Sequence, residues 1–341
     1  MKRKDIGIGI LLCLMIALHP SVNLRAGERD RPSATLHLVE PGPGVFQEAK
    51  LSLGDMLKTL TEKDSQKEPS KKEPPKKDTQ EKSRVERRLD LLKGLGSVLS
   101  STQEIDYRSE RTIGESLALE GFRRYGMPVE DQVLQKYINL VGMAVARNSL
   151  RPGIRYRFVV VKSSLQNAFS CPGGIIFLSS ALLKTIKNEA QLACILAHEV
   201  GHVGHKHALK SIQRAQFFQG VGKITATTMK GEKGKQYESM IGDMQTVLFD
   251  QGLDKNMEFE ADLSGMETAY RTGYDPNGLI EVLKELKRLE AGSQKKGSWF
   301  STHPPLDQRI AKCVNQMNRY PDWKGMARLR HRYVKHKQRI P

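Results

Sequence analysis

Three residues within five positions carry the pattern with the clearest chemical meaning: His198, Glu199 and His202. Because an α-helix advances 3.6 residues per turn, the two imidazoles project from one face about a turn apart. Two such nitrogens can bind one Zn²⁺ at roughly 2.0–2.1 Å each. The intervening glutamate lies beside the ion and can take a proton from a water molecule bound there. The pattern predicts a hydrolytic site with one Zn²⁺ per chain and Glu199 as its general base.

A catalytic zinc ion needs a third protein ligand and one open position. One known pattern would require glycine at position 205 and histidine at position 208, whereas this chain has His205 and Ala208. The alternative source is a glutamate on a later helix, and the segment from Glu258 to Asp262 supplies one. These two residues share a helix face at i and i+4. We therefore expect Glu258 to bind the metal and Asp262 to hold a ligating histidine through a hydrogen bond.

Three neighbouring residues do not fit this pattern. Glu260 points about 200° away from Glu258 around a helix, which predicts a solvated side chain. His205 and His207 follow the histidine pair directly. We favour a surface or structural role for both of them over metal binding.

The histidine pair falls on a well-formed predicted helix. Asn188 is suited to cap that helix, with Gln191 three residues further on. Apolar residues recur at helical spacing between this cap and the end of the pattern, namely Leu192, Ile195, Leu196, Val200 and Val203. The sequence therefore predicts one amphipathic helix that carries both histidines and the glutamate.

A predicted strand just before this helix contains Asn167, Ala168 and Phe169. As an edge of the cleft, its backbone N–H and C=O groups could pair with an extended peptide. We predict substrate binding for these three residues. The alternative is an ordinary sheet strand closed by the turn at Gly173 and Gly174.

The remaining periodicity predicts an α+β fold, mostly helical, with a short β-sheet beside the metal helix. Helical spacing covers Val85–Leu99, Thr112–Tyr125 and Asp131–Asn148. Runs rich in β-branched and aromatic residues predict three strands at Tyr156–Val161, Leu165–Ser170 and Ile175–Leu178.

The two ends of the chain differ from this central part. Residues 1–26 combine a basic start with the apolar run Ile6–Leu18, which predicts an export signal or an N-terminal anchor and hence an exported, periplasmic protein. Residues 27–60 are poorly defined, and 61–83 form a charged linker that cannot pack. We expect the folded domain that carries the metal site to cover residues 84–320. The basic tail 321–341 could contact a membrane surface, but a frayed, solvated terminus is the interpretation we favour.

Composition excludes several classes of protein. The chain has 341 residues, 38% hydrophobic and 27% charged, which excludes a polytopic membrane protein and a wholly disordered one. The net charge of +17 permits contact with nucleic acid. Export and the lack of an aromatic-interleaved basic motif argue against that partner.

Residues from Arg111 to Lys312 resemble the HtpX and CAAX prenyl protease type of gluzincin metallopeptidases, peptidase family forty-eight. The likeness is greatest to soluble exported bacterial members. It includes the histidine pair and is carried further by these segments in order: Gly121–Gly126, Leu134–Gly142, Asn167–Phe169, Pro172–Gly174, Asn188–Ala190, Glu258–Asp262 and Thr302–Ile310.

The resemblance implies a minigluzincin (zincin) core and zinc held by His198, His202 and Glu258. It also implies that His303 lies near the zinc, capping it or aiding catalysis, with Arg309 as its support. The expected substrates are proteins or peptides, including misfolded envelope proteins. A rival interpretation is a latent member of the family that binds clients without cutting them. The chain departs from the family at Asp254 and Lys255, where Ser-Arg is common.

Overall fold

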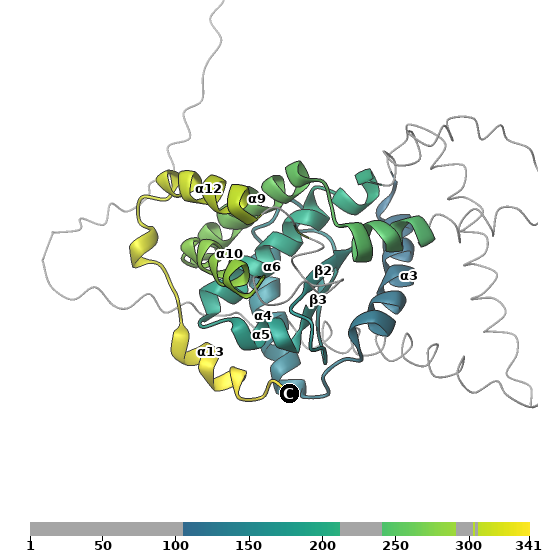
Figure 1. The fold of residues 1–341 in the computed structure, drawn as a ribbon, viewed down its shortest axis with the longest axis horizontal. Helices are drawn as coiled ribbons and strands as arrows, with labels where there is room; N and C mark the ends of the chain where they lie inside the picture. The colour runs from purple at the N-terminus through teal and green to yellow at the C-terminus, as the bar shows by residue number, and fades with distance from the viewer. Residues whose placement is uncertain (1–104, 212–240, 291–302, 304–305) are drawn as a thin grey trace, which may run out of the picture. The chain divides into compact units, whose positions relative to one another are not determined.

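The computed structural model describes residues 105–211, 241–290, 303 and 306–341. The predicted signal, segment 27–60, linker 61–83 and helix Val85–Leu99 lie outside the described residues. The described part is mostly helical around one three-stranded sheet (Figure 1), which confirms the α+β fold class. Its main helices are α3 (Tyr107–Tyr125), α4 (Gln132–Ala146), α5 (Ser180–Thr185), α6 (Glu189–Gly204), α9 (Lys255–Thr272), α10 (Asn277–Glu290), α12 (Leu306–Gln316) and α13 (Arg330–Lys337). Shorter helical turns are η2 (Val247–Gln251), η3 (Met317–Arg319) and η4 (Trp323–Gly325).

The sheet has the strand order β1-β3-β2, in which β1 is Arg157–Val161, β2 is Ala168–Cys171 and β3 is Ile175–Ser179. The central strand β3 pairs parallel with β1 and antiparallel with β2. The tight connection between β2 and β3 passes through Gly173 and Gly174, whose φ angles of 77° and 98° favour glycine. Strand β2 is therefore an edge of the described sheet.

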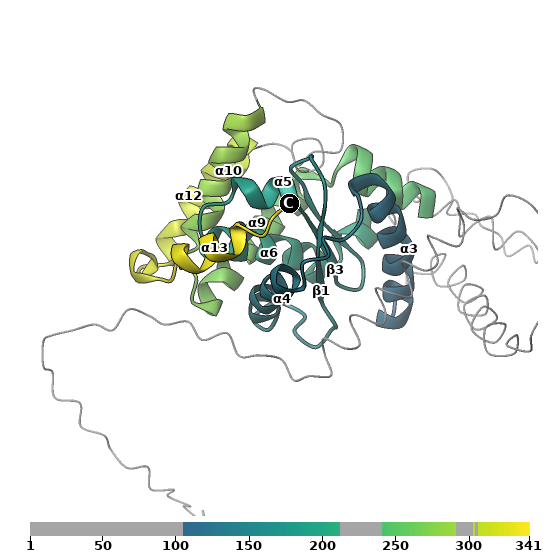
Figure 2. The ribbon, with the colours of Figure 1, turned by 90° about the horizontal axis from the view of Figure 1, so that it is seen from below.

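Both faces of the sheet are covered by helices (Figure 2), so every residue of its three strands is buried. Phe158 and Val160 point to the core shared with α4 and α6. Their neighbours Val159 and Val161 point to a second core, shared with α3. This period-2 alternation sets the metal helix on one face and α3 on the other.

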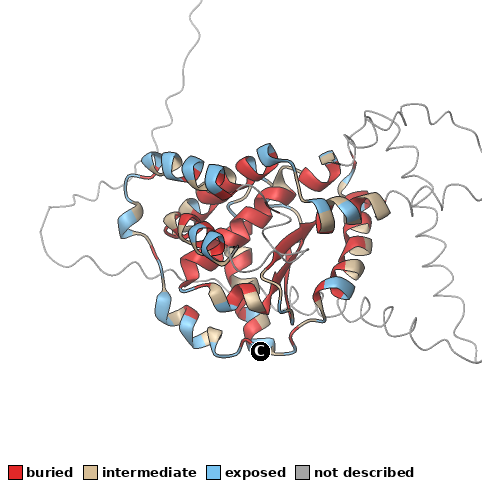
Figure 3. Ribbon diagram, in the orientation of Figure 1, coloured by how far each residue is buried: buried red, intermediate tan, exposed pale blue. Residues whose placement is uncertain are grey.

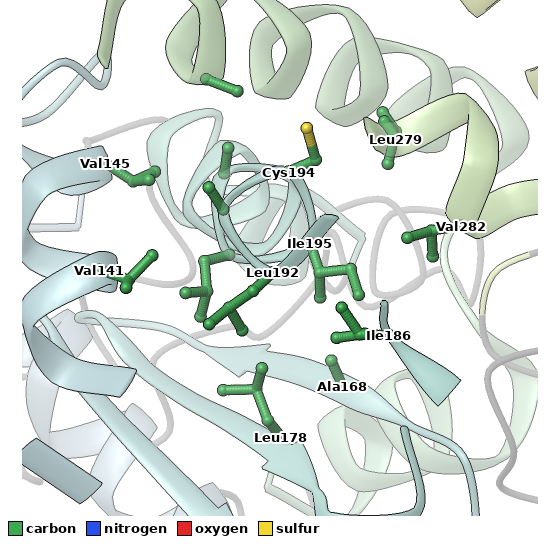
Figure 4. Packing of buried hydrophobic residues seen from close by; sticks show 14 of the residues in the cluster. Val141, Val145, Ala168, Leu178, Ile186, Leu192, Cys194, Ile195, Leu279 and Val282 are labelled. Atoms are coloured by element: carbon green, nitrogen blue, oxygen red, sulfur yellow. The ribbon is translucent and has the colours of Figure 1, made fainter. Parts of the chain in front are cut away.

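Helix α6 passes through the centre of the described fold and is buried along almost its whole length (Figure 3). Its apolar side chains contact α4, the sheet and α10 (Figure 4). Leu192 and Ile195, for example, lie between α4, the sheet and α10 in that view. A helix that is packed on all sides in this way is held rigidly, as a catalytic scaffold requires.

Side-chain caps fix where several of these helices begin. The Asn188 carboxamide accepts a hydrogen bond from the backbone N–H of Gln191 at 3.0 Å, and this starts α6 at the predicted place. Asp106 and Asp131 cap α3 and α4 in the same way. Because Asp106 is the cap, α3 begins five residues before the predicted Thr112.

Most residues of 321–341 are exposed, as predicted, but the region forms helix α13 and packs through a few buried side chains, so the prediction of a frayed terminus is wrong. Tyr333 is buried, and its hydroxyl donates to the Leu183 carbonyl at 2.5 Å. Arg332 forms an ion pair with buried Glu189 in the first turn of α6. Several basic residues of this region therefore have partners within the fold, which composition alone does not reveal.

None of the described helices is both long enough and apolar enough to cross a bilayer.

Candidate active site

The predicted histidine pair and its glutamate lie in the interior turns of α6, and all three are buried. The Nε2 atoms of His198 and His202 are 3.0 Å apart. A tetrahedral ion about 2.1 Å from each nitrogen would separate them by about 3.4 Å, so a small adjustment accommodates one.

Helix α9 brings Glu258 to the same point. Its Oε2 lies 3.6 Å from His198 Nε2, and its Oε1 lies 3.5 Å from His202 Nε2. Glu258 is fully buried, and two glycines allow α9 to approach α6 closely enough to place it there. The structure thus places Glu258, the glutamate selected from its i, i+4 spacing to Asp262, beside the two histidines.

Asp262 and Arg309 form a buried support under these groups. Asp262 Oδ1 lies 2.9 Å from His198 Nδ1, the ring atom that faces away from Glu258. The Arg309 guanidinium donates to both Asp262 oxygens at 2.7 Å. It also lies 2.9 Å from Glu258 Oε2. Its position on α12 therefore ties three elements to one cluster.

His303 lies beside this cluster and is itself buried. Its Nε2 is 3.7 Å from Glu199 Oε1, and its backbone carbonyl accepts a hydrogen bond from Arg309 at 2.9 Å. His198, His202, Glu258 and His303 offer ligand atoms that all lie within 4.8 Å of one another. His303 can thus reach either a bound ion or Glu199.

Burial dominates the electrostatics of the site. It lowers the pKa of His198 and that of His202, which keeps both imidazoles neutral, as metal binding requires. Burial also raises the pKa of Glu258 well above its ordinary value and that of Glu199 to about 8. For Asp262, burial acts in the same direction, but Arg309 and His198 bring its pKa below the ordinary value.

This donor set fits a divalent cation of the zinc type. Two neutral imidazoles and a carboxylate are the ligands of known catalytic zinc sites. Within the described residues, Oε1 of Glu258 is buried and accepts no hydrogen bond. A buried carboxylate oxygen of this kind is costly unless a cation compensates it.

The predicted substrate strand lies at the sheet edge, but its side chains point inward. Asn167, Ala168 and Phe169 are all buried. Asn167 pairs with Ser179 through its backbone, and Phe169 stacks on Phe177 with ring centroids 4.6 Å apart. Any contact with a peptide would therefore use the backbone edge of β2.

Ser170 is a site residue that the sequence did not identify. It follows Phe169 on β2, and its proximity to Glu199 opposes the rise of that carboxyl's pKa, although neither Glu199 carboxyl oxygen has a hydrogen-bond partner among the described residues. No sequence motif marks this serine, because the contact depends on how the sheet packs against α6.

His205, His207 and Glu260 form a second group just beyond α6. Glu260 is 55% exposed, in line with the predicted solvated face, yet its Oε2 lies 3.0 Å from His207 Nε2. His207 is fully buried, so a surface position does not apply to it.

A buried helix with two histidines and a glutamate, placed between a small sheet and a second helix that carries another glutamate, defines a zincin-like metallopeptidase fold. The chain belongs to peptidase family M48, whose profile matches residues 132–316.

Curated relatives agree with this family. The chain is 29% identical over 238 residues to the beta-barrel assembly-enhancing protease of Yersinia pestis, covering 67% of this chain and 48% of that protein. It is 26% identical over 237 residues to the protein of that name from Escherichia coli strain K12, covering 67% and 47%. The mitochondrial metalloendopeptidase OMA1 of Arabidopsis thaliana is 28% identical over 190 residues, covering 56% and 37%. The chain thus spans about half the length, or less, of these relatives.

Proposed function

We propose that this protein is a zinc-dependent endopeptidase that hydrolyses peptide bonds in proteins. One observation carries the proposal: ligand atoms of His198, His202 and Glu258 converge within 3.0–3.6 Å, beside the buried carboxyl group of Glu199. A zinc ion held by these three residues would supply the Lewis acidity that polarises a peptide carbonyl and acidifies a water molecule.

Side chains of the protein carry out the proton transfers and hold the ligands and the substrate. Glu199 accepts the proton of the attacking water and later delivers it to the leaving amine. Its pKa of about 8 in the absence of metal shows that burial favours the protonated form, which suits this delivery. Asp262 orients His198, and Arg309 holds Asp262 in place. The edge of β2 at Asn167–Phe169 binds an extended substrate through its backbone.

The substrate class follows from location. The basic and apolar pattern of residues 1–26 supports export to a periplasm, with the N-terminal segment acting either as a cleaved signal or as a membrane attachment. We propose misfolded or unassembled envelope proteins as the substrates. The names of the bacterial relatives, which refer to β-barrel assembly, are compatible with this location.

A non-cleaving, client-binding protein is the second candidate. The observation that favours it is the position of His303, which lies close enough to the metal-binding atoms to fill the open coordination position. In that state the site would hold zinc but admit no water for hydrolysis.

The first experiment measures zinc content and casein cleavage for the wild type and for Glu199→Gln. We expect one zinc per chain in both proteins and a loss of activity of at least about 10²-fold in the variant, because the general base is gone. Glu267→Gln, which changes an exposed glutamate on α9, is the matched control and should cleave normally.

The His303→Ala variant separates the two candidates. Faster cleavage would indicate an endopeptidase restrained by its own histidine. Bound zinc without cleavage in any variant, together with retained binding of unfolded casein, would support the client-binding protein. Wild-type protein without zinc would refute both readings of the site.

A further inference from the structure

The two histidines of the metal site differ in the group that faces their second ring nitrogen. In both, Nε2 faces the site. A neutral imidazole that presents the lone pair of Nε2 to a cation carries its proton on Nδ1. For His198 that proton faces the carboxylate of Asp262. For His202 it faces another imidazole, because His207 Nδ1 lies 2.8 Å from His202 Nδ1.

This contact determines which ring nitrogen carries the proton in His202 and in His207. His202 Nδ1–H must donate, so His207 Nδ1 must accept and its own proton must be on Nε2. There the carboxylate of Glu260 lies 3.0 Å away as the acceptor.

A turn directly after α6 brings His207 into contact with His202. The helix closes at His205, whose N–H bonds to the Gly201 carbonyl. Lys206 then adopts the left-handed conformation, with φ of 57°, and turns the chain. A lysine in this conformation is uncommon, and it places a fully buried imidazole directly against His202.

We propose that His207 is a positioning residue for the metal. It fixes His202 as an Nε2 ligand, and Glu260 holds His207 in the one tautomer that can do so. This role rests on the zinc site proposed above. It adds to that site a chain of hydrogen bonds from the ligand His202 through His207 to the exposed carboxylate of Glu260. Partners of this kind orient the ligand ring and increase its basicity.

A second metal site at the same residues is the rival explanation. His205, His207 and Glu260 also offer ligand atoms within 4.8 Å of one another. A cation on His207 Nε2 would move the ring's proton to Nδ1, where it would face the N–H of zinc-bound His202. Two donors cannot share a 2.8 Å contact, so the two cations would exclude each other. The geometry therefore favours the positioning role.

The experiment compares His207→Phe, which keeps a ring but has no acceptor, with His207→Asn, whose side-chain oxygen can replace Nδ1. Zinc affinity is measured by competition with a chromogenic chelator, and thermal unfolding is measured with and without zinc. We expect His207→Phe to weaken zinc binding 10–100-fold. His207→Asn should recover most of that loss. His205→Phe alters the rival site without touching His202 and should bind zinc as the wild type does.

Several results would overturn the proposal. They are wild-type affinity in His207→Phe, an equal loss in the Phe and Asn variants, and a fall from two bound zinc ions to one in His205→Phe. If His207→Phe does not fold, Glu260→Ala provides the test, because its side chain is mostly exposed. It should weaken zinc binding by a smaller factor, and no change would count against the proposal. Wild-type protein that binds no zinc would instead refute the metal site itself.

Discussion

The buried position of Glu199 favours the protonated, neutral carboxyl group, whereas a general base must be ionised. Its carboxyl group is buried, and burial raises its pKa to about 8 from an ordinary value of 4.5. A carboxyl that keeps its proton in the folded state over this interval loses it on unfolding. The contribution of Glu199 to the stability of the metal-free protein therefore falls as pH rises from about 4.5 to about 8.

The variant Glu199→Gln should remove this pH dependence, because its amide mimics the protonated carboxyl group. In metal-free protein we expect the variant to have a higher Tm than the wild type at pH 8, by several degrees, and a smaller advantage at pH 5. Thermal unfolding in excess chelator across this range measures the difference. Glu267→Gln should follow the wild-type curve. Parallel curves for Glu199→Gln and the wild type would contradict the burial argument.

At this scale, the sequence is informative where chemistry is encoded within one helix. The spacing of His198 and His202, and of Glu258 and Asp262, follows from helical geometry, and the structure brings all four together. Ser170 and His207 could not be assigned in the same way. The first depends on the register of the sheet against α6, and the second on a left-handed turn at Lys206.

Among the elements, the contact between α6 and α9 sets the distance between the ligands. A Cβ added at Gly265 of α9 would lie 2.9 Å from the backbone nitrogen of His198. At Gly201 of α6, a Cβ would lie 3.3 Å from the Cα of Ala261. The two helices therefore meet through glycine, and this close approach is what brings Glu258 to the histidines.

Gly265→Ala should separate these helices. We expect the free energy of unfolding to fall by about 1–3 kcal/mol from overpacking. Zinc affinity should fall as well, because Glu258 moves away from His198. Denaturant unfolding of the metal-free protein and chelator competition measure the two effects. Gly153→Ala, at a turn with no neighbouring atom within 4 Å, is the control. Full zinc affinity in Gly265→Ala would mean that helix spacing does not determine the site.

Over the whole of the described chain, the C-terminal region supports the start of the metal helix. Glu189, in the first turn of α6, is buried and accepts hydrogen bonds from Tyr137 and Tyr274 as well as from Arg332. The backbone carbonyl of Arg328 accepts from the N–H groups of Glu189 and Ala190. Glu189 and Arg332, which are 143 positions apart in sequence, thus belong to one cluster at the far end of the helix from the metal site.

Arg332→Ala should leave the Glu189 carboxylate buried without its cation. Loss of a buried partner costs about 3–5 kcal/mol, and we expect the lower end because Arg332 is 25% exposed. Chemical denaturation measures the loss. Adding Glu189→Gln to Arg332→Ala should recover part of it. Arg339→Ala, which removes an exposed pair with Asp131, should cost no more than about 1 kcal/mol. Equal effects of Arg332→Ala and Arg339→Ala would contradict this account.

The packing of this region could not be predicted from the sequence for a physical reason. A run of Lys and Arg has the composition of a solvated terminus, and only the fold provides the buried carboxylate that one of them pairs with. The strands and helices of the centre were predictable, because their apolar spacing reflects burial directly. Long-range ion pairs leave no comparable period in the sequence.

The same cluster has a consequence for the order of events during synthesis. A chain made from its N-terminus yields the histidine pair more than a hundred residues before Arg328 and Arg332. Until those residues arrive, the first turn of α6 lacks its cation and its carbonyl partner. A nascent or truncated chain that ends before them therefore carries the histidine pair on a helix whose first turn has not yet gained these bonds.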